Sequence, residues 1–171
     1  MEVNGYKIHP NADLTGADLT HADLTNANLE DAIMEDANLF GANLTNANLT
    51  NANLFCANLA NANLTHINLT HTNLQGANLA NTNLSNQDLS DRDLWGVDLT
   101  GANLTGANLS KAWMESADLN GANLSDTNLS GAWLREANLA NANLFGAELA
   151  NADMTKANLT GATMPDGTIH A

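Results

Sequence analysis

A hydrophobic residue occupies every fifth position from Leu14 to Met164, without a single change of phase. These 31 central positions hold 27 Leu and 4 Met. An amphipathic helix repeats its apolar stripe every 3.6 residues and a strand alternates every second residue, so a period of five excludes both as the repeating element. A fixed repeat over most of a 171-residue chain instead predicts a solenoid, in which each unit buries its apolar residues against its neighbours.

Each repeat has the same internal order. Ala stands two residues before the centre in 24 of 31 repeats, and the residue between them is Asn in 18 and Asp in 8. In extended backbone, residues two apart share a face and the one between points the other way. Gly, Asn, Asp or His stands two residues after the centre in 26 repeats, and these residues best tolerate the positive φ of tight turns. One repeat therefore predicts one flat side and one corner, with Ala and Leu inward.

The spacing of unusual residues indicates how many sides make a coil. Trp113 and Trp133 are 20 residues apart, and the methionines Met34, Met114 and Met154 differ by 80 and 40. These separations are multiples of 20, which favours four sides per coil. Burial of the central residues is the expected source of stability. Our representative core positions are Leu14, Leu64, Leu104, Met34, Met114 and Met154.

The run ADLTGADLTHADLTNANL, continued as far as GATM, resembles the pentapeptide repeat proteins, whose consensus is A(D/N)LXX. The resemblance covers about 155 residues and implies an all-β fold, a right-handed quadrilateral β-helix. With 31 repeats, we expect about eight four-sided coils. The expected organisation is an N-terminal cap at 1–11, the β-helix at 12–164 and a short C-terminal tail at 165–171.

Sequence motifs for catalysis or cofactor binding are missing. There is no glycine-rich phosphate loop, CxxC or HExxH, the five His do not share a column, and Cys56 is alone. We therefore predict a protein that is not an enzyme, with no catalytic residues, no cofactor and no metal.

The charge of the chain restricts its partners and its compartment. The 19 acidic and 5 basic side chains give a formal net charge of -14, which disfavours nucleic acid and anionic membrane surfaces. Apolar runs are only a few residues long, and the N-terminus MEVNGYKIHP lacks the apolar region of a signal peptide. We predict a cytoplasmic protein of the cyanobacterial type, because members of this family are abundant in cyanobacteria.

Departures from the repeat gather on one of the four predicted sides. The 20-residue arithmetic places Trp95, Trp113 and Trp133 on the outside of this side, with Phe55 two coils before Trp95. Clustered exposed Trp is typical of a protein interface, although an aromatic row could equally serve to stabilise the surface.

Arg92 occupies a position that is normally Ala, in the same repeat as Asp93. Because a buried unpaired guanidinium is costly, we expect either a bulge that turns Arg92 outward or a pair with nearby carboxylates. We include Arg92 and Asp93 in the predicted interaction surface.

Three functions remain open at this stage. The first is a non-catalytic scaffold that binds a protein partner, or itself, through the aromatic side. The second follows from the resemblance: pentapeptide repeat proteins of the fluoroquinolone-resistance type mimic duplex DNA and bind DNA gyrase, a topoisomerase. The absence of any charged residue from 37 to 87 argues against an evenly charged DNA mimic. The third is a structural protein with no defined partner. Open strand edges at the last coil also predict self-association through a coil end.

Overall fold

The computed structural model describes residues 1–171 and divides the chain into two compact units, Met1–Thr82 and Asn83–Ala171. Its only continuous strands are β1 (Glu2–Val3) and β2 (Tyr6–Lys7), which form an antiparallel hairpin. The repeats themselves form turns and single-residue β-bridges. None of the chain is helical, so no helix is present that could cross a membrane.

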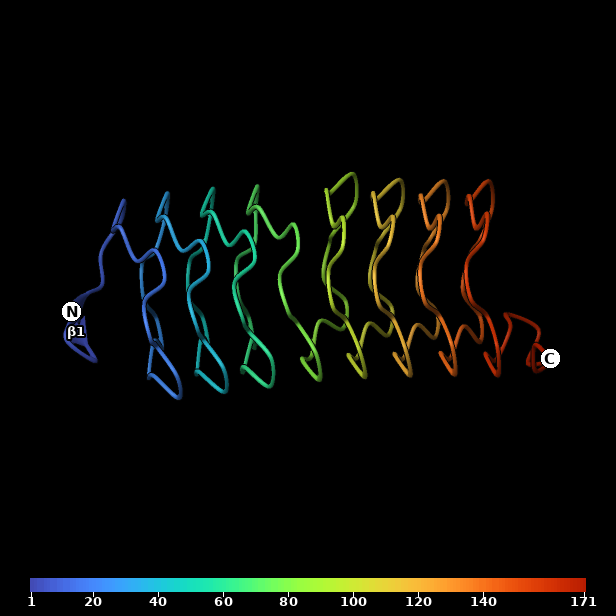
Figure 1. Ribbon diagram of the computed structural model, residues 1–171, viewed down its shortest axis with the longest axis horizontal. Coiled ribbons are helices and arrows are strands. Elements are labelled where there is room, and N and C mark those ends of the chain that lie inside the picture. The colour runs from blue at the N-terminus through green and yellow to red at the C-terminus, as the bar shows by residue number, and fades with distance from the viewer. The chain divides into compact units, whose positions relative to one another are not determined.

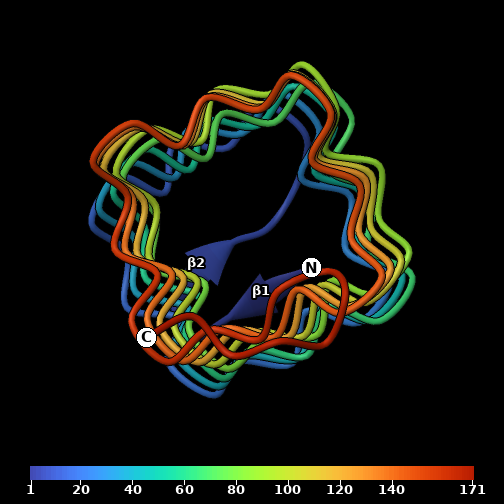
Figure 2. The same cartoon turned by 90° about the vertical axis from the view of Figure 1, so that its right-hand side faces the viewer.

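Parallel bridges join residues that are 20 apart in both units. Asn43 pairs with Asn63 in the first unit, and Trp113 pairs with Trp133 in the second. Since the central residue recurs every five positions, a 20-residue register gives four sides to a coil, which confirms the spacing argument. Figure 1 shows the successive coils within each unit, and Figure 2 shows their four-sided outline.

Backbone hydrogen bonds hold each coil to the next. In the first unit the Leu24 N–H donates to the Asn43 carbonyl at 2.8 Å, and the Asn43 N–H donates to the Ala22 carbonyl at 2.9 Å. The same pair of bonds recurs along both units. The peptide groups of the flat sides therefore form hydrogen bonds to neighbouring coils along the stack, and only side chains project outward from these sides.

The corner positions have the left-handed backbone that the sequence predicts. Gly, Asn, Asp and His at these corners have positive φ, except Asp166 in the last repeat, as Gly16, Asn26 and His21 illustrate. Five corner residues of other types share this conformation, with φ between 55° and 62°. They are Cys56, Lys111, Ser116, Glu136 and Lys156.

The interior of each unit is filled by the central residues and by Ala. Leu14, Leu64, Leu104, Met34 and Met114 are at most 2% exposed. Met154 departs from the prediction, because it is only half-buried. It lies in the last full coil of the second unit, where one face of the apolar layer has only the short tail beside it.

Thr replaces Ala at three buried positions without leaving a hydroxyl unpaired. The hydroxyl groups of Thr72, Thr82 and Thr127 donate to backbone carbonyls at 2.6–2.8 Å. No buried side-chain nitrogen or oxygen lacks a hydrogen-bond partner. The interior therefore tolerates a hydroxyl because a carbonyl lies within reach.

The segments on either side of the repeats fold onto them. At the N-terminus, Ile8 is buried and the Tyr6 hydroxyl accepts a hydrogen bond from the Asp18 N–H at 3.2 Å. At the C-terminus, Ile169 pairs antiparallel with Thr163, and the His170 N–H donates to the Ala162 carbonyl at 2.8 Å. Residues 1–11 and 165–171 thus each contact the repeat next to them.

Candidate protein-interaction surface

One side of the second unit carries all three Trp of the chain, and we call it the Trp face. Its central residues are Leu94, Met114, Leu134 and Met154. Two outward columns flank them, one of Asp93, Trp113, Trp133 and Asp153, the other of Trp95, Glu115, Arg135 and Thr155. Parallel bridges join each member of the first column to the next, so this column is continuous across four coils.

The three indoles are largely open to solvent. Trp95 is 54% exposed, Trp113 59% and Trp133 47%. The rings of Trp113 and Trp133 lie with centroids 6.3 Å apart and planes inclined by 51°. In a tilted pair much of each ring stays uncovered, so stacking between neighbouring coils buries only part of the contact area of each Trp side chain.

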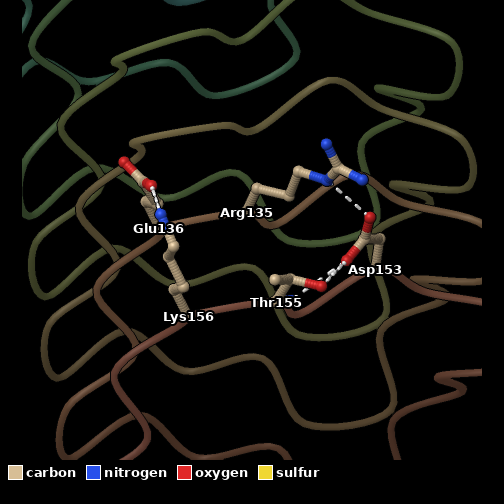
Figure 3. A network of polar contacts seen from close by, with 5 residues as sticks. All are labelled: Arg135, Glu136, Asp153, Thr155 and Lys156. Carbon is tan, nitrogen blue, oxygen red and sulfur yellow. Dashed lines mark hydrogen bonds and ion pairs between the residues drawn. The ribbon is translucent and has the colours of Figure 1, made fainter.

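Arg135 lies over one of these rings. Its guanidinium carbon is 5.8 Å from the Trp133 ring centroid, and its Nε donates to Asp153 Oδ2 at 2.6 Å. Figure 3 shows the Asp153 carboxylate between Arg135 and Thr155, whose hydroxyl and N–H donate to Oδ1 at 2.6 and 3.0 Å. The chain therefore supplies its own cation to Trp133, held in place by a carboxylate one coil further on.

These contacts shift the acid–base equilibria of the residues involved. The Thr155 hydroxyl, followed by the hydrogen bond from Arg135, lowers the pKa of Asp153 to about 2. The hydrogen bond to Asp153 raises the pKa of Arg135, and the negative charge of Glu115 contributes to that shift. Both side chains therefore stay charged across the physiological range, and Glu115 is close enough to act on Arg135.

The corner beside the Trp face also has unusual residues. Ser116, Glu136 and Lys156 occupy successive corners of this edge, all with positive φ. Lys156 Nζ donates to Glu136 Oε1 at 2.7 Å (Figure 3), which lowers the pKa of Glu136 and raises that of Lys156. A left-handed backbone is unfavourable for these residue types.

Arg92 keeps its regular place in the backbone pattern. Its carbonyl accepts a hydrogen bond from the Trp113 N–H at 2.8 Å, so no bulge turns this repeat outward. The side chain is half-buried. Its charge is the smallest of the influences that lower the pKa of Asp88, the largest being the Ser90 hydroxyl. The bulge is therefore not seen, and the other expected outcome, a pair of Arg92 with a carboxylate, stays a prediction.

The other predicted surface residues divide between the two units. Asp93 lies in the Trp113 column, whereas Phe55 is 39% exposed and belongs to the first unit. A role for Phe55 beside the Trp residues stays a prediction.

Sequence reasoning missed Arg135 and Asp153. Their signal was a base and an acid 18 residues apart, the spacing that also joins Thr105 to Asn123 across neighbouring coils.

No group of three or more His, Cys, Asp or Glu side chains in the structure could hold a metal ion.

The four-sided coils can be compared with known proteins. The family profile of pentapeptide repeats matches in eight copies over residues 9–36, 32–70, 67–91, 88–121 and 122–161. The chain belongs to the pentapeptide repeat family. Pentapeptide repeat proteins form right-handed quadrilateral β-helices, and the handedness of the coils is inferred from this family property.

Two solved pentapeptide repeat structures resemble the chain over most of its length. HetL, involved in heterocyst differentiation regulation in the cyanobacterium Nostoc sp. strain PCC 7120, is 38% identical, with 94% of this chain and 75% of HetL covered and a TM-score of 0.52. QnrB1, a plasmid-mediated fluoroquinolone resistance protein, is 19% identical, with 89% and 81% covered and a TM-score of 0.50. At that identity QnrB1 shows the fold alone. No curated protein sequence matches the chain.

Proposed function

We propose that this pentapeptide repeat protein is a non-catalytic scaffold of about eight coils, which binds a partner protein through the Trp face. The observation that carries the proposal is that all three Trp residues of the chain project from one side and are 47–59% exposed. Trp is the residue most enriched among those that dominate interface energy, and its exposure in a cluster is unusual for a surface without a partner. The proposed compartment is the cytoplasm.

Charge favours a different protein over a second copy as the partner. The second unit carries 11 acidic and 4 basic side chains, a net charge of −7. Two such units brought together would repel each other, whereas a neutral or basic partner would not. The same net charge disfavours nucleic acid.

Partner capture tests the proposal. The purified protein would be immobilised and exposed to lysate of the source cells, with bound proteins identified by mass spectrometry. We compare wild type with a Trp95→Thr, Trp113→Thr, Trp133→Thr variant, because Thr is common at the outward position after the central residue and Thr163 occupies the position before it. The matched control is Phe145→Thr, which removes an aromatic ring that is 55% exposed on another side of the second unit.

We expect a partner that wild type and the Phe145→Thr protein retain and the triple variant loses. Losing a few aromatic anchors at an interface centre commonly costs ~2 kcal/mol or more each, enough to abolish capture. Retention of every captured protein by the triple variant would contradict the proposal.

A DNA-mimic function is the second candidate, and the net charge of -14 favours it. The uncharged stretch from 37 to 87 weighs against it, because an even phosphate-like charge would be interrupted there. Inhibition of gyrase supercoiling by the wild-type protein, unchanged in the triple Trp variant, would favour this candidate over the Trp face.

A further inference from the structure

The chain contains two Asn–Gly pairs, and they stand in different structural settings. Asn4 and Gly5 form the turn between β1 and β2, whereas Gly121 is a corner residue of the second unit with Asn120 just before it. An Asn followed by Gly is the sequence most prone to spontaneous loss of the side-chain amide, because Gly has no side chain that hinders attack by its own backbone nitrogen. The backbone around each pair therefore decides whether it reacts.

The reaction is an attack of the backbone on the side chain. The Gly N–H gives its proton to hydroxide, and the nitrogen attacks Cγ of the preceding Asn. A new N–Cγ bond closes a succinimide ring, the Cγ–Nδ2 bond breaks, and Nδ2 leaves as ammonia with a proton taken from water. Water then opens the ring at either carbonyl, which gives Asp or isoaspartate. The Gly nitrogen must therefore be free of a hydrogen-bond acceptor and able to move toward Cγ.

The Asn4–Gly5 turn meets this requirement. Both residues are exposed, and the Gly5 N–H donates to no other residue. The strands β1 and β2 have only two residues each, so the hairpin is marginally stable by itself (Figure 2). The contact from Asn4 Nδ2 to the Asp18 carbonyl is long, at 3.4 Å, and adds little to it. The turn can therefore open and rearrange without unfolding the coils.

The Asn120–Gly121 pair does not meet the requirement. The Gly121 N–H donates to the Ala140 carbonyl of the next coil at 2.9 Å, and the Asn120 N–H donates to Asp118 Oδ1, also at 2.9 Å. Leu139, the central residue before Ala140, is completely buried. Freeing the Gly121 nitrogen requires the separation of two packed coils, which costs far more than opening a terminal hairpin.

We propose that Asn4 is a site of spontaneous deamidation whose isoaspartate product loosens the N-terminal cap, and that the coil structure protects Asn120. Isoaspartate carries the main chain through the former side chain, so it lengthens the turn and disturbs the register of β1 against β2. It also replaces the amide that donates to Asp18 by a carboxylate. The buried Ile8 and the hydrogen bond from the Asp18 N–H to the Tyr6 hydroxyl hold the hairpin on the first coil, and both contacts depend on that register.

Peptide mapping with trypsin measures the two pairs separately. The chain has only five Lys and Arg residues, so Asn4 is recovered in the peptide 1–7 and Asn120 in the peptide 112–135. The folded protein is aged at neutral pH, then unfolded, digested and analysed by mass spectrometry that distinguishes Asn, Asp and isoaspartate. We expect Asn4 to convert at least roughly tenfold faster than Asn120, and the two to convert at similar rates in guanidinium chloride. Equal rates in the folded protein would overturn the proposal.

Two variants test the role of the hairpin. Tyr6→Phe removes the hydroxyl that accepts the Asp18 N–H, so Asn4 should convert faster while the rate of Asn120 stays the same. Asn4→Gln keeps an amide but disfavours ring closure. Fresh wild type and fresh Asn4→Gln should be cut by trypsin after the exposed Lys7 at the same rate under native conditions, whereas aged wild type should be cut faster than aged Asn4→Gln. The proposal is wrong if Tyr6→Phe converts no faster than wild type, or if the aged proteins are cut equally.

Discussion

Met114 and Met154 occupy the same column of the second unit, two coils apart, yet Met114 is completely buried and Met154 is half-exposed. The residues are identical and their repeats are in phase, so burial is what differs between them. The pair therefore measures how much of the stability comes from enclosure of a coil by coils on both sides.

We expect Met114→Ala to lower the free energy of unfolding by about 2–5 kcal/mol, the range for emptying a well-packed core position. Met154→Ala should cost less than about half as much, because its side chain has lost less contact with water. Chemical denaturation of the two variants provides the measurement. Equal losses would show that the terminal coil is enclosed in solution.

The corners offer a test of backbone strain. Ser116 has φ 60° and Gly121 has φ 64°, and a Cβ on Gly121 would meet no atom within 4 Å. We expect Gly121→Ala to destabilise the protein by about 1–2 kcal/mol, the cost of a left-handed L-residue. Ser116→Asn should raise the thermal midpoint, because Asn tolerates this conformation. A Gly121→Ala protein as stable as wild type would contradict the strain argument.

Acid should weaken the fold through its Asp–Thr pairs. Hydroxyl groups of Thr15, Thr20 and Thr25 lower the pKa of the Asp two residues before each, and the pKa of Asp153 falls to about 2. The unfolded Asp titrates near ~3.9, so these pairs contribute stability above that pH and lose it as the pH falls toward the folded values.

We therefore expect the urea midpoint to fall between pH 4 and pH 2, and to fall less steeply in an Asp153→Asn variant. Asn is suitable there because Asn43 accepts the Thr45 hydroxyl at 2.6 Å in the same geometry. Identical pH profiles for the two proteins would show that Asp153 does not contribute to the acid sensitivity of the fold.

The C-terminal coil is where we expect self-association. Ile169 is 64% exposed, and Leu149, Met154 and Leu159 are only half-buried. Light scattering at increasing concentration should show a mass above that of the monomer, reduced by Ile169→Asp. The control is Ile33→Asp, at an exposed Ile of the first unit. A monomer at all concentrations would rule out this contact.

The fold was predictable because, in a coil of 20 residues, residues that are 20 apart in the sequence lie next to each other in adjacent coils. The spacing of Trp113 and Trp133 in the sequence is the spacing of their β-bridge, and the Gly, Asn, Asp and His corners other than Asp166 have positive φ. The five-residue phase gave no sign of two units. Their boundary at Thr82 coincides with the start of the stretch where Thr82, Gln87, Arg92 and Val97 replace Ala.

The detail of the Trp face was less predictable. Periodicity places Trp133 and Arg135 outward, but the position of the guanidinium depends on Asp153 in the next coil and on Thr155, which orients that carboxylate. Such contacts come from individual side-chain conformations, which a repeat pattern does not encode.

The central claim is that the Trp residues serve binding and that the fold stands without them. The most direct measurement is the thermal unfolding of the Trp95→Thr, Trp113→Thr, Trp133→Thr protein by circular dichroism. Loss of the one tilted ring pair and of the Arg135 contact with Trp133 is worth about 1–2.5 kcal/mol, or a fall of roughly 2–10 °C for a chain of this length. We predict a midpoint within that range of wild type. A fall of roughly 15 °C or more would show that the Trp face stabilises the coils and would contradict the claim.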